Sequence, residues 1–185
     1  KSPEPLEKGI LRAARELFVF KDGTVRFDVT NAALTHFTPK EVGVSVEKLR
    51  ELGYETDAFG DPLVSEDQLV ELKVQDVIIP LKAAEYLFRV SKFIDDLLTR
   101  FYGLPPYYNL ENPRDLVGHL LFTISPHTFV ANVVRVVGFT EADVILAHPY
   151  LHAAKRRNVD GDEDSLILGL VCLLNFSKSY LPYKP

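Results

Sequence analysis

A short stretch of the chain, KRRNVDGDED at residues 155–164, carries possible metal ligands directly beside cations. Asn158, Asp160 and Asp162 recur at every second position, and in an extended or turning backbone such side chains point to the same side. Carboxylate and amide oxygens are the ligands that hard divalent cations take in proteins. The spacing therefore predicts that these three residues converge on a metal ion, with Gly161 allowing the backbone to bend.

Three cations, Lys155, Arg156 and Arg157, come directly before these ligands. Phosphoryl transfer requires this combination, because a divalent metal neutralises developing charge while basic side chains hold phosphate oxygens. We therefore predict a phosphoryl-transfer site here, in which the acids bind the metal and the three cations contact phosphate.

Two other interpretations of the stretch use the same acids. In the first, Asp162 and its two acidic neighbours only begin a helix, where free amides and the helix dipole favour negative charge. In the second, the acids form a calcium loop of the EF-hand type, but Ser165 and Val171 then stand where Gly and Glu are required. The calcium loop is excluded on that ground, and a solvated loop before a helix remains as the alternative.

The histidines are a second candidate for metal binding. His148 and His152 are four residues apart, a spacing that can present two imidazoles to a metal on one face of a helix. Pro149 interrupts this pattern and no suitable third ligand accompanies it, so a structural or phosphate-side role is favoured. The single cysteine, Cys172, lies in an apolar run and is predicted to be a buried thiol.

The composition is that of an ordinary globular domain, with 185 residues, 46% hydrophobic and 25% charged. A net charge of −5 argues against a protein that coats nucleic acid through bulk positive charge, so any such contact must be local. No segment has the roughly eighteen consecutive apolar residues of a membrane span, and we expect a cytoplasmic protein with no membrane partner. The absence of Met suggests an excised, processed or engineered segment.

Periodicity and capping residues predict the elements that position these side chains. The clearest is a helix over residues 83–102, where apolar residues recur on one face. The other predicted helices cover residues 45–52, 112–122 and 165–176, the last because its run is strongly apolar. The predicted strands cover residues 16–20 and 24–30, joined as a hairpin, and then 69–80, 128–139 and 144–148. The acids are thus expected between a strand and a helix.

Five segments together carry a resemblance to a known family. The longest is HPYLHAAKRRNVDGDED at residues 148–164, a far more specific signal than a lone Asp-x-Asp. The others are VFKDGTVRFD (19–28), HFTP (36–39), SPHT (125–128) and LNFSKSYLP (174–182). These segments closely resemble the large, catalytic subunit of archaeal family-D DNA polymerases, and the similarity covers essentially the whole chain.

The resemblance implies a fold and a set of site residues. The fold is α+β, a double-psi β-barrel with inserted helices, and we expect residues 1–185 to form one domain of the polymerase catalytic core with a helical insertion around residues 83–122. Asp160 and Asp162 would be the catalytic, metal-binding acids and Asn158 an additional ligand. Lys155, Arg156 and Arg157 would contact phosphate or DNA.

The resemblance also implies a reaction and partners. The reaction is attack of a primer 3′-hydroxyl on an incoming deoxynucleotide, with Mg²⁺ as cofactor and Mn²⁺ as its substitute. The implied partners are primer–template DNA, dNTP, the remainder of the large subunit with its second barrel, and a small proofreading subunit. We expect no activity in isolation. The alternative is a non-catalytic barrel scaffold, natural or engineered, whose acids bind metal weakly or not at all.

Overall fold

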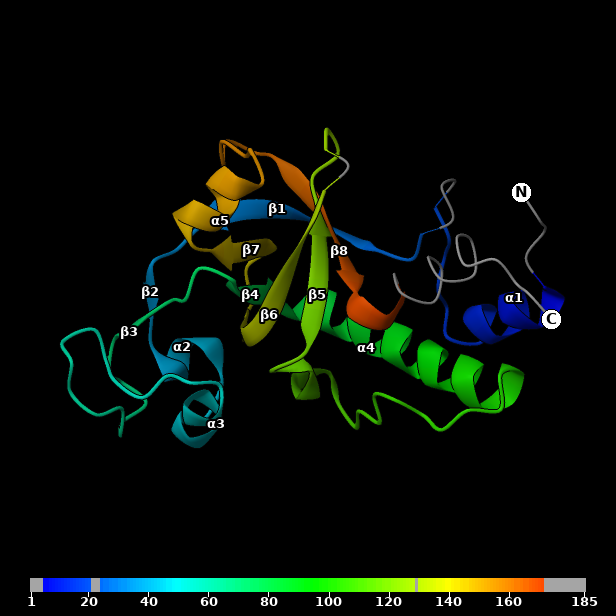
Figure 1. Cartoon of the computed structure of the whole chain (residues 1–185), viewed down its shortest axis with the longest axis horizontal. Helices are drawn as coiled ribbons and strands as arrows, with labels where there is room; N and C mark the ends of the chain where they lie inside the picture. The colour runs from blue at the N-terminus through cyan, green and yellow to red at the C-terminus, as the bar shows by residue number, and fades with distance from the viewer. Residues whose placement is uncertain (1–4, 21–23, 129, 172–185) are drawn as a thin grey trace, which may run out of the picture.

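The chain folds around a closed β-barrel (Figure 1). The computed structural model describes residues 5–20, 24–128 and 130–171. Within them, the strands neighbour one another in the order β1-β7-β4-β6-β5-β8, and β8 closes the barrel against β1. The strands are β1 (Phe27–Ala33), β4 (Asp76–Pro80), β5 (Leu120–Ile124), β6 (Ala131–Thr140), β7 (Val144–Ala147) and β8 (Glu163–Leu168). This mixed six-stranded barrel with added helices confirms the predicted α+β, double-psi β-barrel class.

The strand pairing brings distant parts of the chain together. β1 lies parallel to β7, and β4 lies parallel to β6, whereas the other barrel pairs are antiparallel. Parallel neighbours need long crossover connections, so helices and loops fill the intervening sequence. In the closing pair Thr30 lies opposite Glu163 and Phe27 opposite Leu166. The beginning of β8 is therefore fixed beside the middle of β1.

A long helix, α4 (Leu81–Asp96), packs against the barrel and continues as a π-helical turn, Leu97–Phe101 (Figure 1). Its stripe of Ala83, Leu87, Val90 and Ile94 is almost fully buried, which confirms the helix predicted there from periodicity. Asp95 on this helix is also buried, and its carboxylate accepts three backbone N–H bonds of 2.8–2.9 Å from residues 107–109. The segment after the helix is thereby tied back onto it.

A small lobe beside the barrel is built from two short strands and two short helices. These are β2 (His36–Phe37), β3 (Val70–Glu71), α2 (Pro39–Val42) and α3 (Val46–Glu51). Thr38 and Ser45 cap the two helices, because the side-chain oxygen of each accepts a backbone N–H of the first turn. The lobe packs on β6 at Gly138, where an added Cβ would come within 2.5 Å of the Val42 Cβ. Glycine at this position allows the close approach of strand and helix.

Several predicted elements are wrong. Residues 16–20 follow a helix, α1 (Leu6–Ala13), and form no strand, while the predicted turn at 21–23 lies outside the described residues. The predicted helix over 112–122 is a single 3₁₀ turn, Pro113–Leu116, followed by β5. The predicted strand over 69–80 is two strands, β3 and β4.

The predicted helix over 165–176 is also wrong in its first part, because Glu163–Leu168 is the strand β8; residues 172–176, with Cys172, lie outside the described part of the chain. A short apolar run fits a buried strand as well as a helix, and pairing with β1 and β5 decides the outcome here. In the described part of the chain, no helix has the length and apolar character needed to cross a membrane.

Candidate functional site

The predicted site lies between a short helix, α5 (Pro149–Ala154), and β8. His148 caps this helix through its Nδ1, which accepts the Tyr150 N–H at 3.1 Å, and Pro149 occupies the first turn. His152 is buried on the same helix, and its Nε2 donates to the Ala32 carbonyl at 2.9 Å. Burial lowers the pKa of His152, with the nearby Lys155 contributing in the same direction. Both histidines therefore serve local structure in this fold.

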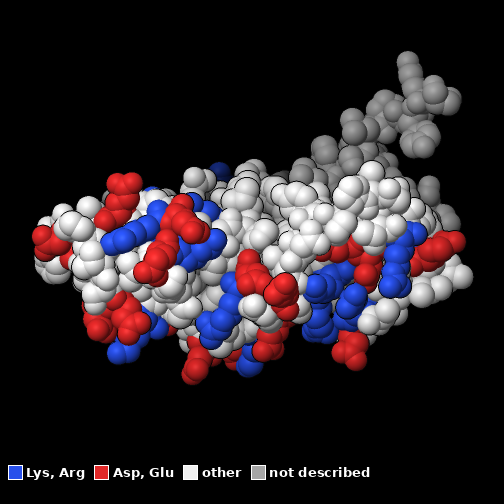
Figure 2. Space-filling model, turned by 90° about the horizontal axis from the view of Figure 1, so that it is seen from below, with Lys and Arg blue, Asp and Glu red and all other residues white. Residues whose placement is uncertain are grey.

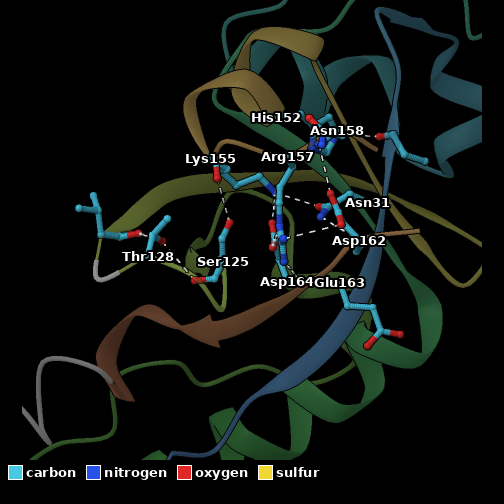
Figure 3. Close-up of polar contacts among 12 residues, drawn as sticks. Asn31, Ser125, Thr128, His152, Lys155, Arg157, Asn158, Asp162, Glu163 and Asp164 are labelled. Atoms are coloured by element: carbon cyan, nitrogen blue, oxygen red, sulfur yellow. Dashed lines mark hydrogen bonds and ion pairs between the residues drawn. The ribbon is translucent and has the colours of Figure 1, made fainter. Parts of the chain in front are cut away.

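Lys155, directly after α5, is buried together with an acid (Figure 3). Its Nζ donates to Asp164 Oδ2 at 2.6 Å and to Asn31 Oδ1 at 2.9 Å. Burial lowers the pKa of Lys155 while the bond to Asp164 opposes that shift. Burial also disfavours the charged form of Asp164, but the bonds from Lys155 and Arg157 outweigh it and hold the pKa of Asp164 low. The Lys155 side chain is buried in this structure, so it has no exposed surface with which to make the predicted contact with phosphate.

The other two predicted phosphate ligands differ in their surroundings. Arg157 donates from Nε to Asp164 Oδ1 at 2.6 Å and also bonds the Glu163 carbonyl. Its Nη1 lies 3.8 Å from Asp162 Oδ1, a looser ion pair. Arg156 is exposed and has a left-handed backbone conformation, with φ of 59°. Of the three cations, only Arg156 presents its side chain openly to solvent.

The acid loop, residues 158–162, joins these cations to β8. Asp162 Oδ2 accepts the backbone N–H of Asn158 at 3.1 Å, which closes the loop on itself. Asp160 lies at its exposed turn, next to Gly161 with φ of +108°. Val159 has φ of 59°, a conformation that costs a β-branched residue free energy. The structure thus joins the Asn158 backbone to the Asp162 carboxylate and leaves Asp160 open to solvent.

The donor set of this loop fits a hard divalent cation. Two carboxylates and an amide supply oxygen ligands, and Mg²⁺ is commonly bound through one or two carboxylates plus water and substrate phosphate. Among the described residues, no group of three or more His, Cys, Asp or Glu side chains is gathered as a metal site. Any metal held here would therefore complete its coordination with Asn158, water or substrate.

Two residues that matter to the site were not singled out from the sequence. Asn31, on β1, donates its backbone N–H to the Asp162 carbonyl at 2.9 Å. Asp164 was interpreted only as an acid at a helix start, which is wrong because it belongs to β8. No local spacing in the sequence indicates the contact between Asn31 and Asp162, because the two residues are 131 positions apart and meet only when the barrel closes.

The comparison with known proteins matches all of residues 1–185 to one family, described as "DNA polymerase II large subunit DP2, catalytic domain". The chain belongs to this family. Curated archaeal relatives agree with the assignment. The DNA polymerase II large subunit of Pyrococcus furiosus is 63% identical over 184 residues, that of Methanothermobacter thermautotrophicus 60% over 182, and that of Archaeoglobus fulgidus 58% over 184.

These matches cover 98–100% of this chain but only 15–17% of the relatives' own length. The predicted resemblance to the family-D polymerase large subunit is thereby confirmed. What the whole polymerase subunit does, and with which partners, extends beyond the part that this chain represents.

Proposed function

We propose that this chain is the acid-bearing part of a DNA polymerase catalytic core and acts in Mg²⁺-dependent nucleotidyl transfer. The observation that carries the proposal is that the acid loop is closed by the Asn158 N–H on the Asp162 carboxylate and is tied to β1 through Asp162 and to β8 through Arg157. Membership of a polymerase catalytic-domain family supports the reaction class.

Asp160 and Asp162 are the proposed catalytic acids, and with Asn158 they would hold Mg²⁺, with Mn²⁺ as a substitute. The bound metal would lower the pKa of a primer 3′-hydroxyl and stabilise the leaving pyrophosphate. Two hydrogen bonds orient Asp162: its side-chain carboxylate accepts the backbone N–H of Asn158, and its backbone carbonyl accepts the backbone N–H of Asn31. Asp160 is exposed and is the acid most open to an incoming substrate.

The three cations divide between two proposed roles. Arg156 is exposed beside the acid loop, so we assign direct contact with phosphate or DNA to it. Lys155 and Arg157 were also predicted as phosphate ligands, but both are held by Asp164. We propose that they support the acid loop and balance its negative charge.

The proposed partners are primer–template DNA, dNTP, the remainder of the large subunit with a second barrel, and a small proofreading subunit. On the face drawn in Figure 2, basic and acidic side chains are interspersed. Together with the net charge of −5, this pattern favours local contacts with DNA over binding along one broad basic surface. The rest of the polymerase would then contribute most of the DNA-binding affinity.

A non-catalytic barrel scaffold is the second candidate function. It is favoured by one observation, that the described residues gather no cluster of three acidic or imidazole ligands. In a scaffold, Asp160 and Asp162 could both be replaced without functional loss, whereas nucleotidyl transfer requires both.

A titration of Mn²⁺ into the 185-residue chain tests the proposal, with paramagnetic broadening of amide NMR signals as the measurement. We expect selective broadening around residues 158–164 and its loss in an Asp160→Asn, Asp162→Asn double variant. A Glu141→Gln, Asp143→Asn double variant, altered at exposed acids between β6 and β7, is the matched control. Broadening that is equal in all three proteins would favour the scaffold.

A further inference from the structure

We propose that Asn31 is a positioning residue for the acid loop, which it holds through Asp162. This inference rests on the proposed function and extends it to a side chain on β1. Asn31 is 3% exposed, and both its backbone and its side chain are bonded to residues that flank or form the acid loop.

Asn31 makes a pair of bonds to the Asp162 carbonyl. Its oxygen accepts the backbone N–H of Asn31 at 2.9 Å and the side-chain Nδ2–H of Asn31 at 3.3 Å. The last paired residues of β1 and β8 at this end of the two strands are Thr30 and Glu163. Asn31 thus extends the ladder by one step beyond that pair and reinforces the step with its side chain.

The side chain of Asn31 has a fixed orientation. Its Oδ1 accepts from Lys155 Nζ at 2.9 Å, and that Nζ is in turn held by Asp164 at 2.6 Å (Figure 3). The amide can donate to Asp162 only with its oxygen turned toward Lys155. The buried cation therefore selects the amide orientation that places the donor on the Asp162 carbonyl.

This arrangement also positions one of the proposed metal ligands, Asp162. With its carbonyl held, Asp162 keeps its carboxylate within 3.1 Å of the Asn158 backbone nitrogen. Removing a residue that hydrogen-bonds to a metal ligand and orients it commonly lowers metal affinity by about 10- to 100-fold. We assign this kind of supporting role to Asn31, which does not itself supply a ligand.

The test compares Asn31→Ala with Val29→Ala, a buried position two residues earlier on the same strand that makes no bond to the acid loop. The first readout is hydrogen exchange of the Asn158 amide, which needs no metal. We expect its protection to fall in Asn31→Ala and to remain in Val29→Ala, when both are measured under conditions where the proteins are equally folded. Equal protection in the two variants would overturn the proposal.

The second readout is the Mn²⁺ concentration needed for half-maximal broadening of signals from residues 158–164. We expect it to rise about 10-fold or more in Asn31→Ala and to change little in Val29→Ala. If exchange protection falls only in Asn31→Ala but the wild-type chain has no selective Mn²⁺ site, the positioning role stands and the proposed function fails.

A second variant keeps the test decisive if Asn31→Ala does not fold. Asn31→Asp retains the shape, an oxygen for Lys155 and the backbone bond to the Asp162 carbonyl, but its side chain cannot donate to that carbonyl. We expect the Asn158 amide to lose protection in this variant too. Retained protection there would contradict the assigned role of the Nδ2–H bond.

Discussion

Lys155 and Asp164 form a buried ion pair with 2.6 Å between Nζ and Oδ2, and neither side chain is exposed to solvent. Asp164 also accepts from Arg157, so one carboxylate organises two of the three cations that precede the acid loop. The contact joins the end of α5 to β8 across the loop itself. This buried ion pair therefore anchors the two ends of the acid loop to the folded core.

Removing one partner of this pair should destabilise the chain strongly. We expect Lys155→Met to lower the free energy of unfolding by about 3 kcal/mol, because it leaves a buried carboxylate with fewer partners. A Lys155→Met, Asp164→Asn double variant should recover part of that loss, since the uncompensated charge is gone. Urea unfolding followed by circular dichroism measures both values.

The matched control for this prediction is Lys82→Met. Lys82 lies 2.7 Å from Asp143, but the two side chains are 69% and 65% exposed. An exposed pair of this kind contributes about 0–1 kcal/mol. If Lys155→Met cost no more than Lys82→Met, the buried pair would not stabilise the fold.

His152 should make stability depend on pH. Its folded pKa lies below the ordinary value of 6.5 because burial disfavours the imidazolium, with the Ala32 bond and Asp164 opposing and Lys155 adding to the shift. Among the described residues, its buried Nδ1 has no hydrogen-bond partner, so a proton there would have no acceptor. The His152 imidazole therefore binds a proton more readily in the unfolded chain than in the folded chain. The resulting stability is present above pH 6.5 and is lost as the pH falls through the folded pKa.

The corresponding experiment is urea unfolding of wild type and His152→Gln between about pH 5 and pH 7.5. Glutamine can still donate to the Ala32 carbonyl but does not titrate. We expect the stability of the variant to fall less steeply on acidification. His127→Gln, at an exposed histidine, should retain the wild-type slope, and equal slopes for all three proteins would count against the assignment.

Gly138 should tolerate no side chain while Val42 is present. The Cβ of an alanine there would lie 2.5 Å from the Val42 Cβ and 3.2 Å from the Val42 carbonyl oxygen. We expect Gly138→Ala to cost about 1–3 kcal/mol through overpacking between β6 and α2. Thermal unfolding should register this as a loss of about 2–4 °C per kcal/mol.

Two comparisons identify the cause of that loss. In a Val42→Gly background the added cost of Gly138→Ala should shrink, because the nearest atom is gone. Gly9→Ala, on α1 with no atom closer than 4.0 Å to the added Cβ, should be neutral or slightly stabilising. An undiminished cost in the Val42→Gly background would point to strain within β6 itself.

The sequence predicted elements best where a signal was long or chemically specific. The apolar stripe of α4 spans several turns, and the helix predicted over residues 45–52 begins after Ser45, whose side-chain oxygen caps it. The predictions failed where tertiary pairing decides. The run predicted as a helix over residues 165–176 begins with apolar residues that fit either a helix or a strand, and pairing with β1 and β5 makes its first part the strand β8.

The candidate site divides in the same way. The spacing predicted that the side chains of Asn158, Asp160 and Asp162 converge on a metal, and that stays a prediction; the contact present is between the Asn158 backbone N–H and the Asp162 carboxylate. The placement of Lys155 could not be predicted, because its partner Asn31 is 124 positions away and reaches it only when β1 and β8 pair. A run of three basic residues in sequence gives no information on which of them will be buried.

The closure of the barrel by β8 against β1 also determines the order in which the chain can fold during synthesis. β1 occupies residues Phe27–Ala33, and its two neighbours, β7 and β8, do not emerge from the ribosome until residues 144–168 have been made. Long-range strand pairing of this kind slows folding and leaves apolar strand faces uncovered meanwhile. The helix α4 and the β5–β6 hairpin, which need only local contacts, are the elements that can form first. The acid loop is thus completed last, when the final strand of the barrel arrives.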